Sequence, residues 1–320
     1  MKYLSLFSGI GAFESALKNL NIPFDLVGFS EIDKYAVKSY CAIHNVSETL
    51  NLGDITKIDE TQLPKVDFIT YGFPCQDISL AGKQQGLFNE DGSKTRSGLF
   101  FDALRLIEHT QPKVAIAENV KNLTSKKFAE QFQIVLNSLE EAGYNNYWMV
   151  LNSKDFGIPQ NRERVFIVSI RKDCDTGIFE FPMSHGETTK SFYEYIDDNI
   201  SEKEASECLL DWCDLEKMSD FGAGYRFGGV MVKGRIYNTI AANYGKINGN
   251  SGKFFRNHRV SCLTAKECFR LMGFKDEDFE KAEKVNSNTQ LYKQAGNSIV
   301  VDVAEELLCM LFDEEGNFFI

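Results

Sequence analysis

The fold is decided near the N-terminus by the stretch Tyr3–Gly11, which reads YLSLFSGIG. Tyr3–Phe7 is rich in β-forming residues and predicts a strand, and the pattern at Glu14–Asn19 predicts a helix after it. The two glycines between them let the backbone pass close to a ligand, with helix N–H groups pointing at it. The third glycine of a dinucleotide fingerprint would fall at Glu14, whose carboxylate would repel a pyrophosphate. The stretch therefore predicts a ligand site at the first turn of an α/β fold and disfavours NAD and FAD.

Two further acidic residues follow at positions that suit a nucleoside. Glu31 ends the second predicted strand, 20 residues after Gly11, where a carboxylate that binds ribose hydroxyls usually lies. Asp54, in Gly53-Asp54-Ile55, could accept a hydrogen bond from an adenine amino group. This combination suits a nucleoside without phosphates, such as S-adenosylmethionine. The alternative is that Glu31 and Asp54 are solvated loop or helix-capping residues, and spacing alone does not separate the two.

The first 170 residues continue this alternation of strands and helices. β-rich runs lie at Tyr3–Phe7, Phe24–Phe29, Val66–Tyr71, Val114–Ala117, Tyr147–Leu151 and Val165–Ile170, and helical patterns at Glu14–Asn19, Lys34–His44, Leu99–His109 and Phe128–Ala142. Alternation of this kind predicts crossover units and a mostly parallel sheet with helices on both faces. The connection Asn152–Arg164 has no helical pattern, so the last two strands are expected to be antiparallel.

A candidate nucleophile follows the third predicted strand. Val66–Tyr71 runs into Gly72-Phe73-Pro74-Cys75-Gln76. Ligands bind at the carboxyl ends of parallel strands, so Cys75 is expected at the same edge as the glycines of the first turn. Pro74 stiffens the turn that carries the thiol, and a thiol near a helix N-terminus or a cation can ionise and act as a nucleophile. The plainer interpretation is a small buried cysteine.

Charged side chains from two more segments are expected at this edge. Glu118 follows the strand Val114–Ala117, and a half-buried carboxylate there could act as an acid or a hydrogen-bond donor. Arg162 and Arg164 precede the strand Val165–Ile170, which begins at this edge if it is antiparallel, so both arginines are then expected to reach the site. A capping glutamate and a solvated strand entry are the alternatives, which the convergence of three segments weakens.

The composition is that of a globular protein with an acidic balance. The 320 residues are 43% hydrophobic, 12% aromatic and 25% charged, which excludes disorder as the main state. The net charge is −11, from 35 basic and 46 acidic residues, which taken alone argues against a protein that coats nucleic acid. The eight cysteines include no C-x-x-C pair and there are four histidines, so we expect no metal site and no disulfide framework. No run of 18 apolar residues is present and no signal-peptide cleavage motif follows Met1–Leu17, so a cytoplasmic location is expected.

The charges are unevenly distributed and suggest three domains. Residues 191–220 carry ten acids and two lysines, net −8, whereas residues 221–260 carry seven basic residues and no acid, net +7. We expect a catalytic and cofactor-binding domain at 1–171, a loop-rich basic domain at 172–259, and C-terminal helices at 260–320 that pack back on the first. Thr264-x-x-Glu267 and Ser287-x-x-Gln290 resemble capping boxes, and an amphipathic pattern predicts a last helix over Val300–Leu311.

Five motifs follow one another along the chain: Phe7-Ser8-Gly9-Ile10-Gly11, Gly72-Phe73-Pro74-Cys75-Gln76, Glu118-Asn119-Val120, Gln160-Asn161-Arg162-Glu163-Arg164 and Gln294-Ala295-Gly296-Asn297-Ser298. In this order they resemble the motifs of bacterial and phage DNA (cytosine-5)-methyltransferases of the restriction–modification type. The resemblance covers almost the whole chain, with Ala12 where the family usually has a second glycine. It implies the Rossmann-like fold of S-adenosylmethionine-dependent methyltransferases, a mostly parallel sheet with an antiparallel last strand, plus a small target-recognition domain.

The resemblance also implies roles for individual residues. The Cys75 thiolate would add to carbon 6 of cytosine, Glu118 would hold or protonate ring nitrogen 3, and Arg164, with Arg162, would steady the base oxygen and nearby phosphate. S-adenosylmethionine would give its methyl group to carbon 5 and leave as S-adenosylhomocysteine. The residues implied to bind it are Phe7, Ser8, Gly9, Ile10, Gly11, Glu31, Ile32, Asp54, Ile55, Gly72, Pro74 and Asn297.

The implied partner is double-stranded DNA that contains one short recognition sequence, with the target cytosine flipped out of the helix. The segment Ser79–Gly98, with four glycines and three basic residues, is expected to close over the DNA as a lid. Thr239-Ile240 resembles a Thr-Leu element of the family's recognition region. The residues expected to contact DNA are Gln76, Ser79, Lys83, Arg96, Arg226, Lys233, Arg235, Thr239, Lys246 and Lys253.

Other readings of the sequence remain open. One is a methyltransferase of the same fold that acts on tRNA cytosine, although that group more often has Pro-Pro-Cys before the glutamine. Another is an inactive DNA-binding relative, which the joint presence of Cys75, Glu118 and Arg164 disfavours. A Rossmann oxidoreductase is disfavoured by Glu14. We expect a monomer, and a cognate restriction endonuclease encoded nearby is compatible with the resemblance.

Overall fold

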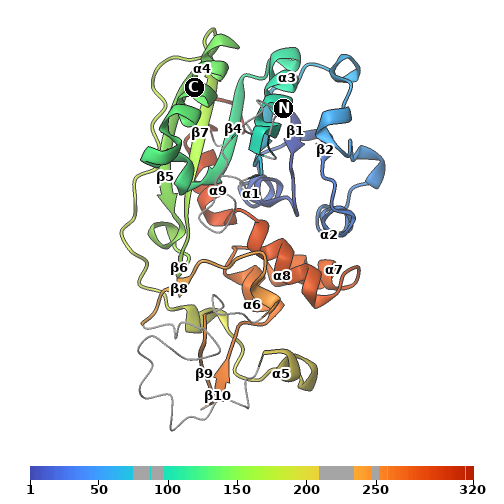
Figure 1. Ribbon diagram of the computed structural model, residues 1–320, viewed down its shortest axis with the longest axis vertical. Helices are drawn as coiled ribbons and strands as arrows, with labels where there is room; N and C mark the ends of the chain where they lie inside the picture. Colours follow the sequence, from blue (N-terminus) through green and yellow to red (C-terminus); the bar gives the residue numbers. More distant parts are fainter. Residues whose placement is uncertain are drawn as a thin grey trace.

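A computed structural model describes residues 1–74, 87, 95, 97–208, 234–246, 252–257, 259–313 and 315–320. In Figure 1 the central sheet and the helices on its faces form the upper part of the molecule. The helix α5 and the strands β9 and β10 lie at the bottom, and α6, α7 and α8 lie between them and the sheet. Across the described parts of the chain, no helix combines the length and the apolar character that crossing a lipid bilayer requires.

Six strands form one sheet in the order β2-β1-β3-β4-β7-β5. Their bounds are β1 Lys2–Leu6, β2 Asp25–Ser30, β3 Phe68–Tyr71, β4 Val114–Val120, β5 Tyr144–Asn152 and β7 Glu163–Arg171. The strands β2, β1, β3 and β4 pair in parallel. All six predicted strands are confirmed, with ends displaced by up to three residues. The mixed α/β fold with a mainly parallel sheet is also confirmed.

Two layers of helices cover the sheet because alternate side chains of each strand point to opposite faces. On one face Tyr3 and Phe68 pack with α1 (Ala12–Asn19) and α9 (Val301–Cys309). On the other, Leu4 and Ile69 pack with the second layer, α3 (Phe100–Thr110) and α4 (Ala129–Glu141). The helix α2 (Lys34–His44) packs against Phe29 of β2. The four helices predicted before residue 170 are confirmed.

The strand β7 runs antiparallel to both of its neighbours. It pairs with β5 from Tyr144 opposite Arg171 to Asn152 opposite Glu163, as the connection without a crossover helix predicts. It also pairs antiparallel with β4, where Val120 lies opposite Arg164. The start of β7 therefore lies at the edge of the sheet where β4 ends, and this brings Arg164 close to Glu118.

The rest of the described chain is made of short elements. The helices are α5 Glu202–Cys208, α6 Ala265–Arg270, α7 Asp276–Glu283 and α8 Asn288–Asn297. The strands are β6 Gln160–Asn161, β8 Tyr237–Asn238, β9 Phe254–Arg256 and β10 Arg259–Ser261, of which β6 pairs with β8 in parallel and β9 with β10 antiparallel. Single 3-10 turns lie at Glu48–Leu50, Ile55–Lys57, Glu60–Gln62, Ser97–Leu99, Lys121–Thr124, Lys126–Phe128, Ser153–Phe156, Phe192–Tyr195 and Tyr244–Lys246.

The C-terminal helices begin as predicted in one case and differently in another. Thr264 and Glu267 form both hydrogen bonds of a capping box at the start of α6, which confirms the first prediction. Ser287 is the N-cap residue of α8, but its side chain makes no capping hydrogen bond, so the second predicted capping box is wrong. The last helix forms as predicted, ending two residues earlier at Cys309.

The carboxylate of Glu267 joins three segments of the lower part of the molecule. Its two oxygens accept hydrogen bonds at 2.7 Å from the two terminal nitrogens of Arg256. They also accept the backbone N–H groups of Asp197 and Thr264, each at 2.8 Å. Both side chains are almost fully buried, at 2% and 0% exposure. Because each carboxylate oxygen accepts two hydrogen bonds, the pair can be buried without leaving an unsatisfied charge.

Removing the Glu267 carboxylate should destabilise the fold strongly. The Glu267→Ala variant leaves the buried Arg256 guanidinium without its anion, which costs about 3–5 kcal/mol of unfolding free energy. Urea unfolding followed by circular dichroism measures this loss. The matched control is Glu60→Ala, which removes the partner of a partly exposed arginine, Arg105, and should cost about 0–1 kcal/mol. Equal losses in the two variants would contradict the role given to Glu267.

Candidate active site

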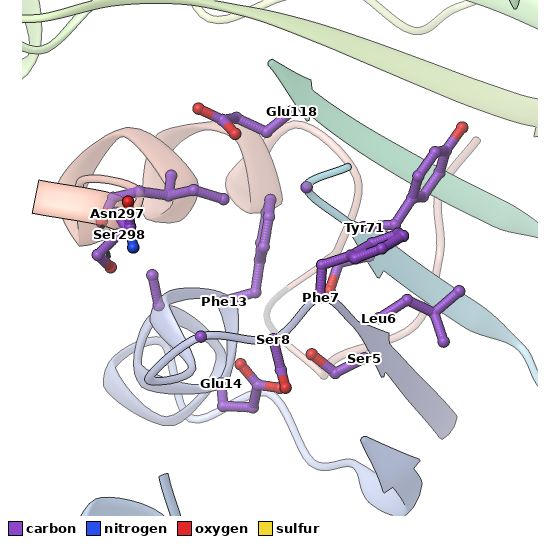
Figure 2. A pocket seen from close by; sticks show the side chains of 15 residues that line it. Ser5, Leu6, Phe7, Ser8, Phe13, Glu14, Tyr71, Glu118, Asn297 and Ser298 are labelled. Atoms are coloured by element: carbon purple, nitrogen blue, oxygen red, sulfur yellow. Dashed lines mark hydrogen bonds between the residues drawn. The ribbon is translucent and has the colours of Figure 1, made fainter. Parts of the chain in front are cut away.

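A pocket of about 450 Å3 opens at the carboxyl ends of β1, β3 and β4 (Figure 2). Its lining comes from the first turn of the fold, from β3 and β4, and from the end of α8. The lining residues are Ser5, Leu6, Phe7, Ser8, Gly9, Ala12, Phe13, Glu14, Thr70, Tyr71, Gly72, Glu118, Asn297, Ser298 and Ile299. Residues from the C-terminal part of the chain and from the first strand therefore line the same pocket.

The loop after β1 is held in an unusual backbone conformation. Phe7, Gly9 and Gly11 all have positive φ angles, of 52°, 57° and 79°. The carboxylate of Glu31 fixes this loop from β2, since it accepts the N–H of Gly9 at 3.0 Å and that of Asp33 at 2.8 Å. Burial raises the pKa of Glu31. The carboxylate that the sequence placed at the end of the second strand therefore adjoins the glycine loop.

A buried histidine supports the same loop from behind. The His44 Nε2 atom lies 2.9 Å from the carbonyl oxygen of Ile10, and its Nδ1 atom lies 3.1 Å from the Lys18 Nζ atom. Burial lowers the pKa of His44 to about 3, so the ring is neutral at physiological pH. Since a carbonyl only accepts, Nε2 carries the hydrogen and Nδ1 accepts from Lys18. The ring occupies the space that a side chain at Gly11 would need.

Glu14 is a buried carboxylate in the pocket wall, on the side of Ser5 and Ser8 (Figure 2). It is 1% exposed, and its Oε1 atom accepts the Tyr40 hydroxyl at 2.8 Å and the Tyr3 hydroxyl at 3.4 Å. Burial raises the pKa of this carboxyl group. A carboxylate in this wall disfavours a phosphate ligand, as its sequence position predicted.

Glu118 lies on the opposite side of the pocket and is paired with Arg164. The Arg164 Nε atom lies 3.0 Å from Glu118 Oε1, and the two side chains are 18% and 14% exposed. A side chain at Gly72 would place its Cβ atom 3.5 Å from Glu118 Oε2, so the strand that leads to Cys75 passes beside this carboxyl group. Burial raises the pKa of Glu118, and the charges of Arg164 and Arg162 oppose that rise. The arrangement thus places a carboxyl group with a raised pKa at the edge of the sheet, beside an arginine.

Arg162 has a different environment from Arg164. It is 3% exposed, and its guanidinium donates to three backbone carbonyls, those of Ile240 at 2.8 Å, Gly296 at 3.0 Å and Ser298 at 2.6 Å. Both terminal nitrogens are thus bound to the protein itself. The sequence predicted that both arginines reach the site. The structure places Arg164 on Glu118 and Arg162 against the backbone behind the pocket wall.

The pocket, the acid–arginine pair and the motif order can be compared with known proteins. A model of the family described as C-5 cytosine-specific DNA methylase matches residues 1–312. The chain belongs to this family. The methylase is 36% identical to the type II methyltransferase M2.ScrFI of Lactococcus lactis subsp. cremoris, over 98% of this chain and 100% of that protein. It is 33% identical to the type II methyltransferase M.HhaI of Haemophilus parahaemolyticus, over 95% and 92% of the two chains. The family predicted from the five motifs is confirmed, and the methylase is an enzyme of this type.

Solved structures share the fold of the methylase. The Dnmt2 methyltransferase of S. pombe superposes with a TM-score of 0.70 at 24% identity, over 96% of this chain and 97% of that one. A DNMT2 mutant of Spodoptera frugiperda gives a TM-score of 0.72 at 20% identity, over 98% and 99% of the two chains. At this identity the likeness shows the fold alone.

The structure brings some of the predicted cofactor residues together and leaves others apart. Of the twelve, those that line the pocket are Phe7, Ser8, Gly9, Gly72 and Asn297. Ile10 and Gly11 lie behind the loop and are buried, Glu31 holds it, and Pro74 is half-buried at the end of the described segment. Asp54 caps the turn Ile55–Lys57, where hydrogen bonds from Thr56 lower its pKa, and Ile32 is 77% exposed. Ile55 is buried in that turn. The cofactor roles of these residues stay predictions.

Several pocket residues were not predicted. Thr70 lies in β3 among apolar neighbours, and this single polar residue in a buried strand is a signal that could have drawn notice. Ser298 and Ile299 adjoin Asn297, and Phe13 adjoins the glycine loop. Ser298 belongs to the last of the five motifs, although no role was predicted for it, whereas Ile299 and Phe13 have no sequence signature of their own.

The predicted DNA contacts fall into three groups. Arg235, Thr239 and Lys246 are exposed, and Arg235 lies 3.1 Å from Glu187. Lys253 is only 6% exposed, a placement that disfavours the contact predicted for it. Cys75 and the remaining predicted contacts lie outside the described residues, as does most of the expected lid; those contacts are Gln76, Ser79, Lys83, Arg96, Arg226 and Lys233.

The chemistry of the lining fits a cationic nucleoside better than a phosphorylated one. The residues that line the pocket include Glu14 and Glu118 and no lysine or arginine. The Glu14 carboxylate would repel a phosphate and favour a sulfonium or ammonium group, and no cationic side chain of the lining would bind a phosphate. Within the described ranges, no group of three or more histidine, cysteine or acidic side chains is placed to hold a metal ion.

Replacing Gly11 should damage the loop through the buried histidine. In Gly11→Ala the new Cβ atom would lie 2.2 Å from His44 Nε2, at a φ of 79° that L residues rarely adopt. The conformational strain and the clash together should cost about 2–4 kcal/mol of unfolding free energy and weaken binding of S-adenosylhomocysteine. Urea unfolding and calorimetry measure the two effects.

Gly143 supplies the matched control for this substitution. It also has a positive φ, 98°, but no atom lies within 4 Å of an added Cβ. Gly143→Ala should therefore show the conformational cost alone. Adding His44→Ala to Gly11→Ala should recover the part of the loss that comes from the clash. If Gly11→Ala and Gly143→Ala lost the same stability, the support of the loop by His44 would be refuted.

Proposed function

We propose that the methylase transfers a methyl group from S-adenosylmethionine to carbon 5 of a flipped-out cytosine in a short duplex DNA sequence. The observation that carries this proposal is the half-buried Glu118–Arg164 pair beside a pocket whose lining has two carboxyl groups and no lysine or arginine. The pair supplies a donor for a pyrimidine ring, and the pocket suits a cationic methyl donor. The motif that carries Cys75 begins at Gly72, next to Glu118.

Glu118 and Cys75 would act on the same ring. The Cys75 thiolate adds to carbon 6 of the cytosine, and a sulfur–carbon bond forms while the protonated Glu118 donates to nitrogen 3. This proton offsets the negative charge that would otherwise develop on the ring and makes carbon 5 electron-rich. Arg164 would hold Glu118 in place and face the base oxygen. Carbon 5 would then take the methyl group from the sulfonium of S-adenosylmethionine, whose methyl–sulfur bond breaks to leave S-adenosylhomocysteine. A base, which we take to be water, removes the carbon-5 proton, the bond between carbon 6 and the Cys75 sulfur breaks, and the proton at nitrogen 3 returns to Glu118 as the Cys75 thiolate is regenerated.

The pocket would hold the methyl donor beside that ring. S-adenosylmethionine, when bound, would supply an electrophilic methyl group. Glu14 would face its positive charge, and the glycine loop, fixed by Glu31 and His44, would shape the space for it. Glu31 would in addition bind the ribose, and Asp54 the adenine, if its carboxylate turns from Thr56. The cytosine must leave the base stack to reach Glu118, at a cost of roughly a few kcal/mol.

The proposal extends to the division of the chain and its surroundings. Residues 1–171 would form the catalytic domain, 172–259 the target-recognition domain, and 260–320 the helices that close the pocket. The basic stretch 221–260 would face DNA, and the acidic stretch 191–220 would face away from it. The methylase would act as a monomer in the cytoplasm of a prokaryotic cell, with or without a cognate restriction endonuclease.

Two measurements test this function. Purified protein is incubated with labelled S-adenosylmethionine and either unmethylated duplex DNA or tRNA, and label is expected only in DNA. The chain is also expressed in a host without cytosine methylation, and 5-methylcytosine is mapped across the genome, which identifies the target sequence. Label that enters tRNA alone would favour the RNA methyltransferase and reject the proposal.

A further inference from the structure

One buried side chain joins three distant segments of the methylase. Arg162 lies between β6 and β7, and its guanidinium donates to the carbonyls of Ile240, Gly296 and Ser298 at 2.6–3.0 Å. These acceptors are 78, 134 and 136 residues further along the chain. Hydrogen bonds from a charged donor are about twice as strong as neutral ones, so this contact is a firm link between the segments.

The first segment that it holds belongs to the wall of the pocket. Ser298 and its neighbour Asn297 line the pocket, and both are labelled there in Figure 2. Gly296, which precedes Asn297 in α8, contacts a different part of the chain. A Cβ atom at Gly296 would lie 2.3 Å from backbone atoms of Ala241 and Ala242. The backbone of the pocket wall therefore touches the backbone of residues 241–242 directly.

The second segment, residues 237–246, belongs to the basic stretch that would face DNA. It is attached to the chain around Arg162 by a short strand pairing and two hydrogen bonds, besides the Arg162 bond itself. β8 pairs with β6 in parallel at Tyr237 and Asn238. The Thr239 hydroxyl donates to the carbonyl of Asn161 at 2.5 Å, and the N–H of Ile240 donates to the Gln160 side chain at 3.1 Å. Thr239 and Lys246 in this segment are exposed.

We propose that Arg162 is a positioning residue that couples target recognition to the cofactor pocket. Arg162 makes the pocket wall at Gly296–Ser298 and the segment 237–246 move as one body. Cofactor bound in the pocket therefore holds the segment 237–246 in the position that binds target DNA, and bound DNA holds the pocket wall in the position that binds cofactor. The proposal rests on the proposed function. It removes Arg162 from the residues that contact base or phosphate, because its terminal nitrogens are bound to backbone carbonyls. Arg164 remains for that contact.

The test measures the coupling, which is the factor by which S-adenosylhomocysteine changes the affinity for DNA. DNA affinity is measured by fluorescence anisotropy for a duplex with the mapped target sequence, with and without S-adenosylhomocysteine. We expect S-adenosylhomocysteine to strengthen binding to the native protein by at least fivefold, within the usual range of allosteric coupling. In Arg162→Lys, which keeps the charge but cannot reach three carbonyls, the effect should fall below twofold. A role in stability alone would weaken both affinities and leave their ratio unchanged.

Two further variants keep the test decisive. Arg171→Lys is the matched control, since Arg171 lies at the far end of β7 and binds the carbonyl of Gln111 and the side chain of Asp173; it should keep the native coupling. Gly296→Ala pushes the pocket wall away from residues 241–242 without touching a charge, and should lose the coupling as Arg162→Lys does. It serves as the main variant if Arg162→Lys does not fold.

The salt dependence of DNA binding separates positioning from direct contact. An arginine that contacts a phosphate contributes about one unit to the slope of log affinity against log salt concentration. Arg162→Gln should leave this slope unchanged. A slope that falls by about one unit, or a native coupling ratio in Arg162→Lys or Gly296→Ala, would overturn the proposal. Absence of DNA methylation by the native protein would instead reject the proposed function, so the two failures are distinguishable.

Discussion

Cys75→Ala is expected to abolish methyl transfer while DNA binding remains. Without the thiol no bond to carbon 6 of the cytosine can form, and carbon 5 stays a poor nucleophile. Loss of the nucleophile in covalent catalysis removes most of the rate enhancement, so the rate should fall by about 10⁴-fold or more. Transfer of labelled methyl groups to unmethylated duplex DNA measures the rate, and gel shift with the same DNA measures binding.

Cys309→Ala is the matched control for this variant. Cys309 is an exposed cysteine at the end of α9, far along the chain from the pocket residues, and its replacement should leave the rate unchanged. The native protein should also form a covalent complex, stable to denaturation, with DNA that carries 5-fluorocytosine at the target, since the proton at carbon 5 is then replaced by fluorine. Cys75→Ala should form none. Full activity of Cys75→Ala would refute the assignment of the nucleophile.

The strands and their edges were predictable because strong local patterns determine them. The apolar runs of β1, β3 and β4 are buried on both sides, and a strand buried on both faces reads as a continuous apolar run. The antiparallel β7 followed from one connection without a helix, and this single inference placed Arg164 at the same edge of the sheet as Glu118. The ion pair between the two side chains was not itself predicted.

Other contacts had no local signal, because they join residues that are far apart in the chain. The two arginines Arg162 and Arg164 look alike in sequence, yet one binds a carboxylate and the other binds three carbonyls that lie 78 or more residues away. The fit of His44 against Gly11 depends in the same way on how α2 packs behind the first turn. Lys253 shows the limit of counting charges, since a basic residue in a basic stretch is buried. Composition indicates how many charges a segment has, and packing decides which of them reach the surface.

Glu118→Gln is expected to lower the rate of methyl transfer by about 10²–10⁴-fold, the usual contribution of a positioned acid. An amide can still donate a hydrogen bond to nitrogen 3, but it cannot transfer the proton that offsets the charge on the ring. Glu60→Gln is the matched control, because Glu60 also pairs with an arginine, Arg105, away from the pocket. Single-turnover rates with saturating S-adenosylmethionine separate this effect from cofactor binding.

The pH dependence gives the sharper test of Glu118. Burial raises the pKa of Glu118, so its carboxyl group stays protonated to higher pH than that of an exposed glutamate. If the protonated form is the active one, the rate must fall as the pH rises through this pKa, while ionisation of Cys75 limits the rate at low pH. The fall at high pH should therefore be absent in Glu118→Gln, which has no group to titrate there. In Arg164→Met the fall in rate should move to still higher pH. In the native protein the Arg164 guanidinium opposes the rise in the pKa of Glu118, and the variant removes that opposition. A high-pH limb that is the same in the native protein, Glu118→Gln and Arg164→Met would show that Glu118 is not the acid.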